Sequence, residues 1–111
     1  MWQLANFLTI SNTMKATEVT PAAWKDEKVL YDKGNYSAIW GKYQDEKCLG
    51  VRWSGNDGER GYPGQGNYPT WYIEPDFLVL SILQKLLELA IEDKEREHIS
   101  NILFAIKEYS E

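Results

Sequence analysis

Residues 28–53 read KVLYDKGNYSAIWGKYQDEKCLGVRW. Val29 to Tyr31 form a short β-prone run, which ends in residues 32–35, a turn by composition. In residues 36–43 and again in residues 48–53, apolar side chains recur with a period of two, the spacing typical of a strand. The polar residues 44–47 separate these two runs. The stretch therefore predicts a three-stranded antiparallel meander, and residues 71–73 predict a fourth strand.

Residues 76–111 predict helix. The first apolar stripe follows the i, i+3, i+4, i+7 spacing and contains Val79, Ile82, Leu83, Leu86 and Ala90. The second stripe contains Ile99, Ile102, Leu103, Ile106 and Tyr109. At about 100° per residue the second stripe falls on the polar side of the first, so one continuous helix would face two opposite walls. We therefore expect a helical hairpin that breaks near residues 92–94, with Asp93 capping the second helix and Asp76 as the cap or first-turn acid of the first.

These elements predict an α+β fold: a three- to four-stranded antiparallel sheet (a meander) followed by a C-terminal helical hairpin packed on one face. Residues 28–111 form this single domain, and residues 1–27 form an N-terminal extension of uncertain structure. The first helix carries further apolar residues outside its main stripe, namely Phe77, Leu78, Leu80, Leu87 and Leu89. Either this helix lies centrally in the core or it also contacts a partner subunit, and we expect a homodimer.

Charge and cysteine content exclude several classes of protein. The net charge is −5, and residues 76–111 alone carry four basic and eight acidic groups, a net of −4. Because phosphates repel an acidic protein without a basic stripe, we expect no nucleic-acid partner. Cys48 is the single cysteine, which excludes an intrachain disulfide and suits a reducing, cytoplasmic location. The most apolar stretch is shorter than the ~20 residues that a bilayer requires, so no membrane partner is expected.

A glycine-rich segment lies between the predicted third and fourth strands. Residues 54–70 contain five glycines and two prolines, with aromatic residues inside the segment and at both borders. Loops of this length without secondary structure are usually functional or disordered. Three interpretations stay open: a binding loop, a loop pinned to the sheet by its aromatics, or a disordered loop. For the binding interpretation the candidate residues are Arg52, Trp53, Asn56, Asp57, Tyr62, Tyr68, Trp71 and Tyr72.

The chemistry-bearing residues match no catalytic or cofactor motif. Asp57 and Glu59 lack the alternating ligands of a calcium loop, and no metal or cofactor is expected. His98 is the only histidine and is expected at the surface or boundary of the second helix. Cys48 needs a neighbouring base to act as a nucleophile, and most lone cysteines are small buried hydrophobes. Arg52 is expected to form a surface salt bridge. No catalytic residue is assigned.

One resemblance adds to this interpretation. Residues 49–58, LGVRWSGNDG, continue through Gly61-Tyr62-Pro63 to the Pro69-Thr70-Trp71-Tyr72 segment. This pattern resembles small bacterial proteins without an agreed activity, of the kind found on mobile, integron-type gene cassettes. The resemblance implies a bacterial, cytoplasmic and often oligomeric protein, and it assigns no site residue.

Three functional hypotheses follow. The first is a small non-catalytic binding protein (immunity-, inhibitor- or adaptor-like) that uses the Gly/aromatic loop 54–70 to contact a protein partner. The alternative is a small-molecule or sugar-binding module that uses the same aromatic residues. The third is a small enzyme that uses Asp57, Glu59, Arg52 or Cys48.

Overall fold

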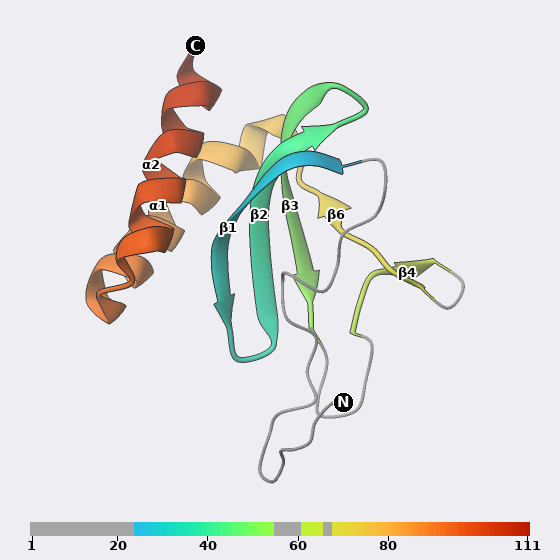
Figure 1. Cartoon of the computed structure of the whole chain (residues 1–111), viewed down its shortest axis with the longest axis horizontal. Helices are drawn as coiled ribbons and strands as arrows, with labels where there is room; N and C mark the ends of the chain where they lie inside the picture. Colours follow the sequence, from blue (N-terminus) through green and yellow to red (C-terminus); the bar gives the residue numbers. More distant parts are fainter. Residues whose placement is uncertain (1–23, 55–60, 66–67) are drawn as a thin grey trace, which may run out of the picture.

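The computed structural model describes residues 24–54, 61–65 and 68–111. The elements in chain order are β1 (Trp24–Lys33), β2 (Tyr36–Tyr43), β3 (Glu46–Trp53), β4 (Gly64–Gln65), β5 (Tyr68–Pro69), β6 (Tyr72–Ile73), α1 (Asp76–Asp93) and α2 (Arg96–Ser110). Four strands form an antiparallel sheet in the order β1-β2-β3-β6, and β4 pairs with β5 in a separate ribbon. Both helices lie beside the sheet (Figure 1). The α+β fold predicted from the sequence is therefore confirmed.

Two tight turns connect the first three strands. The β1–β2 turn is Gly34-Asn35, with Gly34 at a φ of 60°. The β2–β3 turn is Gln44-Asp45, and both of its residues have positive φ, 53° and 68°. The strands are longer than the alternating pattern predicted, because only two residues are unpaired at each turn. β1 also begins at Trp24, before the boundary at residue 28, whereas residues 1–23 of the expected extension lie outside the described residues.

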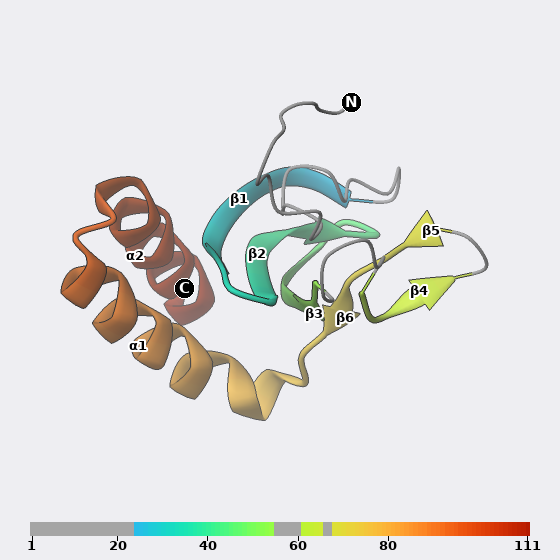
Figure 2. The same ribbon diagram turned by 90° about the horizontal axis from the view of Figure 1, so that it is seen from below.

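The two helices cover one face of the sheet (Figure 2). The core between them contains Leu30, Ala38, Trp40, Leu49 and Val51 from the strands, and Val79, Leu83, Leu86, Ala90, Ile102 and Ala105 from the helices. The stripe predicted for the first helix is confirmed at its four buried positions. The second stripe is wrong at Leu103, which is half exposed, whereas Ala105 is fully buried. The face of α2 that contacts the sheet is thus shifted from Leu103 towards Ala105, whose small side chain allows the helix to approach the sheet closely.

The helical hairpin breaks where the stripes require it. α1 ends at Asp93, and Lys94 follows in the left-handed conformation with a φ of 58°. Asp93 does not cap the second helix as expected, since Glu95 occupies that position without a side-chain cap. Instead, the Asp93 carboxylate lies 3.0 Å from Lys33 Nζ and joins the hairpin to β1. Asp76 lies in the first turn of α1, after Pro75 at the cap position, so its first-turn interpretation holds.

A second, smaller core lies on the other face of the sheet. Trp24, Ile39 and Trp71 are buried there. A Cβ atom at Gly50 would lie 2.9 Å from the ring of Trp24, so only glycine allows β3 to approach this closely. Irregular pairing between Lys25 and Lys28 bends the start of β1, as bulges do. The described chain thus has apolar contacts on both sheet faces.

None of the described helices is both long and apolar enough to cross a bilayer.

Candidate binding surface

The candidate surface begins where β3 ends. Trp53 and Tyr62 form an antiparallel bridge, in which Trp53 N donates to Tyr62 O at 2.6 Å and Tyr62 N donates to Trp53 O. The chain that leaves β3 therefore returns to pair with its last residue. Opposed residues of an antiparallel pair place their side chains on the same face. Both rings are open to solvent, with 53 % of Trp53 and 71 % of Tyr62 exposed.

Gly61 makes this return possible. Its φ is +83°, a conformation that L side chains rarely adopt. A Cβ atom there would lie 2.1 Å from the carbonyl oxygen of Trp53 and 2.6 Å from the carbonyl carbon of Ser54. Because both obstacles are backbone atoms, no side-chain movement would relieve the clash. The bridge between Trp53 and Tyr62 therefore depends on glycine at position 61.

Arg52 holds the base of the same segment. Its Nη1 donates to Thr70 O at 2.6 Å and to Pro63 O at 3.2 Å. Thr70 N also donates to Pro63 O at 3.1 Å, so the two arms of the segment are tied to each other. The expected surface position was wrong, because Arg52 is only 1 % exposed. Burial lowers the pKa of the guanidinium. Arg52 thus organises the segment from within.

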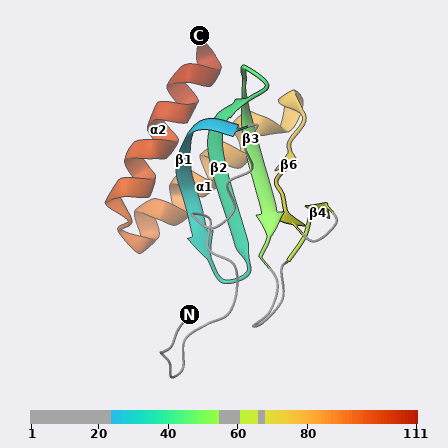
Figure 3. The same cartoon turned by 45° about the vertical axis from the view of Figure 1, so that its right-hand side comes forward.

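Trp71 and Tyr72 lie on opposite faces, as neighbours in an extended chain do. Trp71 is buried in the smaller core against Trp24 and is structural. Tyr72 pairs with Val51 and is half exposed. Since Val51 and Trp53 share a face of β3, Tyr72 lies on the same side as Trp53 (Figure 3 shows β6 beside β3). Trp53, Tyr62 and Tyr72 together are called the aromatic surface below.

Three predicted site residues are left out of the definition of this surface. Asn56 and Asp57 lie outside the described residues, as does Glu59 of the enzyme hypothesis. Tyr68 belongs to β5, where it pairs with Gln65. The structure thus brings together three of the eight candidates as exposed rings and assigns two others, Arg52 and Trp71, to the support beneath them.

Cys48 packs against the smaller core. Its side chain is half-buried, and burial raises the pKa of the thiol. A raised pKa favours the neutral thiol, which is the less reactive form. Within the described residues no three His, Cys, Asp or Glu side chains are grouped closely enough to hold a metal ion.

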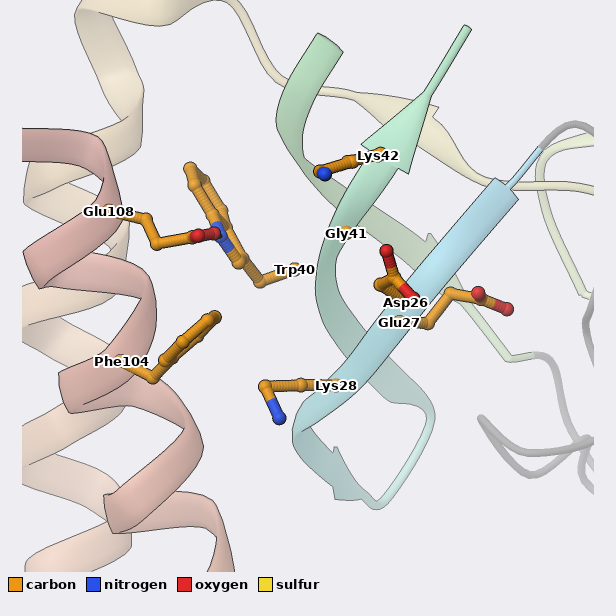
Figure 4. A pocket seen from close by; sticks show the side chains of 8 residues that line it. All are labelled: Asp26, Glu27, Lys28, Trp40, Gly41, Lys42, Phe104 and Glu108. Carbon is orange, nitrogen blue, oxygen red and sulfur yellow. The ribbon is translucent and has the colours of Figure 1, made fainter. Parts of the chain in front are cut away.

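A pocket that the sequence did not indicate lies elsewhere, between α2 and the start of the sheet (Figure 4). Its volume is about 360 Å³, and it is lined by Asp26, Glu27, Lys28, Trp40, Gly41, Lys42, Phe104 and Glu108. These residues come from three distant segments without a shared motif, so no local signal marks them. Several are already paired with each other: Lys28 Nζ lies 4.8 Å from the centre of the Phe104 ring, and Trp40 donates to Glu108. The pocket is thus primarily a joint between α2 and the sheet.

Comparison with protein-family models, curated proteins and solved structures gives no match, so the geometry described above is what any functional argument must rest on.

Proposed function

We propose that this protein is a small non-catalytic binding protein that contacts a protein partner through its aromatic surface. The observation that supports this most is the exposure of Trp53 and Tyr62 on a backbone held by paired hydrogen bonds. Tyr and Trp are enriched among the residues that dominate binding energy at protein interfaces. Large apolar rings on the surface of an acidic protein are poorly solvated by water, so covering them with a partner is favourable.

The support beneath the rings lowers the cost of binding. A loop that must become ordered on contact loses conformational entropy, and that loss weakens the complex. Here the bridge at Trp53 and the bonds from Arg52 hold the borders of the segment before any partner arrives. The rings themselves have few rotatable bonds. The surface is therefore organised in advance, as an interface site needs.

The proposal extends to the setting of the protein. A half-buried, neutral cysteine thiol suits a reducing compartment, and we place the protein in the cytoplasm on this ground. The net charge of −5 favours a protein partner over nucleic acid.

The test is a pull-down from native lysate of the source cell with tagged full-length chain. Wild type is compared with the Trp53→Ala, Tyr62→Ala, Tyr72→Ala triple variant, whose folding is checked by circular dichroism. Leu103→Ala is the matched control, because it removes a half-exposed apolar side chain from α2 instead. A protein that wild type and the control capture and the triple variant loses supports the proposal. Equal capture by all three chains contradicts it.

Fluorescence distinguishes a small ligand from a protein. Of the tryptophans in the described residues, Trp24, Trp40 and Trp71 are buried and only Trp53 is exposed. Among these four, quenching by acrylamide therefore reports mainly on Trp53. Trp53→Phe is the control for the remaining signal, which includes that of Trp2, outside the described residues. Protection by the captured protein supports the proposal. Protection by members of a sugar panel, without any captured protein, would instead favour the sugar-binding alternative.

A further inference from the structure

α1 carries a second, largely apolar stripe outside its four buried positions, and of its residues Leu87 also packs against the core. Phe77, Leu80, Gln84, Leu87 and Ile91 follow each other at intervals of three and four residues, the spacing of a coiled-coil seam. Phe77 is 81 % exposed and Ile91 is 56 % exposed, at opposite ends of the stripe. Figure 2 shows α1 along the outside of the molecule, with no described element beyond it. The helix therefore presents one seam to its own core and another to solvent.

The order of residues along this seam makes it complementary to itself. Phe77 and Ile91 each lie seven residues from Gln84, so Gln84 is the midpoint of the stripe. Two copies related by a two-fold axis can therefore pair antiparallel about Gln84. In that register Phe77 lies beside Ile91 of the second copy, and Leu80 lies near Leu87. The single polar position, Gln84, then comes close to its own symmetry mate near the axis.

Charge selects the antiparallel arrangement over the parallel one. A parallel pair would place Lys94 beside Lys94 and Asp76 beside Asp76, and like charges at such distances repel. The antiparallel pair instead places the exposed Lys94, which follows the last residue of α1, near Asp76 at the acidic start of the other α1, and opposite charges attract. The helix dipoles also oppose each other favourably in this arrangement.

We infer that the exposed face of α1 is the dimer interface of this protein, and that it pairs with α1 of a second copy in antiparallel orientation. The interface buries the stripe that contains Phe77, Leu80, Leu87 and Ile91. It is formed by α1, whereas the aromatic surface is formed by Trp53, Tyr62 and Tyr72, so different substitutions test the two. The inference therefore stands or falls independently of the proposed function.

Sedimentation equilibrium on the full chain gives the first test. We expect a mass near twice 12.9 kDa at micromolar concentrations. The Phe77→Glu, Ile91→Glu double variant should sediment as a monomer. Its circular dichroism and thermal midpoint should equal those of wild type that is diluted until it has the same fraction of monomer. Leu103→Glu, at a half-exposed position on α2, should remain dimeric. A monomeric wild type, or a double variant that stays dimeric, would overturn the inference.

Cysteine cross-linking tests the orientation, in a Cys48→Ser background. In the antiparallel register the two copies of residue 84 lie level with each other along the helix axes, whereas the two copies of residue 77 lie about 21 Å apart. Gln84→Cys should therefore form a disulfide-linked dimer under mild oxidation, and Phe77→Cys should not. Lys85→Cys, on the outward side of the same turn, is the matched control and should not cross-link. Cross-linking through residue 77 but not 84 would show a parallel pair and contradict the proposed orientation.

The aromatic triple variant keeps the two proposals separable. It should remain dimeric while it loses its partner, and the Phe77→Glu, Ile91→Glu variant should become monomeric while it keeps the partner. If the monomeric variant no longer captures the partner while the aromatic triple variant still does, the aromatic surface is not the binding site. A double variant that unfolds at these exposed positions would show that the chain's own residues cover them, and the inference would fail.

Discussion

Trp40 Nε1 donates a hydrogen bond of 2.9 Å to Glu108 Oε1, which joins the middle strand β2 to the last turn of α2 across 68 residues of sequence. The indole of Trp40 is only 3 % exposed. The second carboxylate oxygen of Glu108 lies 3.7 Å from Lys47 Nζ on β3. A single carboxylate therefore connects the end of the helical hairpin to two neighbouring strands.

Removal of this acceptor should destabilise the fold. In Glu108→Ala, the buried indole N–H loses its partner, and an unsatisfied buried donor costs about 1–3 kcal/mol. Glu108→Gln keeps an acceptor oxygen and should cost less. Lys47→Ala removes only the exposed ion pairs of Lys47 with Glu108 and Glu111, each of which contributes about 0–1 kcal/mol. Urea denaturation of the three variants measures the differences. A Glu108→Ala protein as stable as Lys47→Ala would show that the Trp40 bond contributes nothing.

A change at Arg52 should loosen the aromatic surface as well as the fold. Arg52→Lys keeps the charge but loses the planar fork, and lysine does not match such geometry. The carbonyl groups of Pro63 and Thr70 would lose their bonds from Arg52 Nη1, which we expect to cost about 1.5–3 kcal/mol. Amide hydrogen exchange should quicken at Thr70 and Tyr62, whose N–H groups are bonded in the native segment. Unchanged exchange at Tyr62 would mean that the Trp53 bridge holds without Arg52.

The sequence predicted the elements because their signals are local. Period-two alternation marked β2 and β3, and the change of phase between the two helical stripes required a break close to Lys94. The role predicted for Asp93 was wrong. This residue was expected to cap the second helix, but its carboxylate binds Lys33, which is distant in sequence. Such a contact depends on register across the whole sheet, which local spacing does not reveal.

The candidate residues show the same limit. Arg52 and Trp53 are neighbours in sequence, yet one is buried and the other exposed. Alternation indicated that they face opposite sides, but not which side the segment after β3 would cover. The return of Gly61 to Trp53 decides that, and it depends on one backbone conformation. The three exposed rings were candidates because of the composition of the segment. The hydrogen bonds that support them became evident only from the structure.

The turn between β2 and β3 offers a stabilising substitution. Gln44 and Asp45 both adopt positive φ, and a glutamine in this conformation is strained. The Gln44→Asn, Asp45→Gly double variant introduces the Asn-Gly pair that two-residue turns of this kind prefer. We expect a gain of about 1 kcal/mol in the free energy of unfolding, measured with urea. Gln44→Ala, which keeps the strain, should bring no gain. A double variant no more stable than wild type would contradict this assignment of strain.

Tyr36 makes the stability of the fold depend on pH in the alkaline range. Burial raises the pKa of its phenol to about 12, and the negative charge of Glu74 acts in the same direction. The unfolded chain ionises this tyrosine near its ordinary value of 10, whereas the folded chain keeps the proton. Between these two pH values the unfolded state therefore binds fewer protons, and stability falls as the pH rises. Urea denaturation of wild type and Tyr36→Phe from pH 9 to about pH 12 tests this, because the variant should lose less stability over that window. Glu74→Gln should move the onset of phenolate absorbance of Tyr36 to lower pH, in a difference titration against Tyr36→Phe. If wild type and Tyr36→Phe decline in parallel, the alkaline loss comes from other groups, and Tyr36 is not the tyrosine that burial keeps protonated.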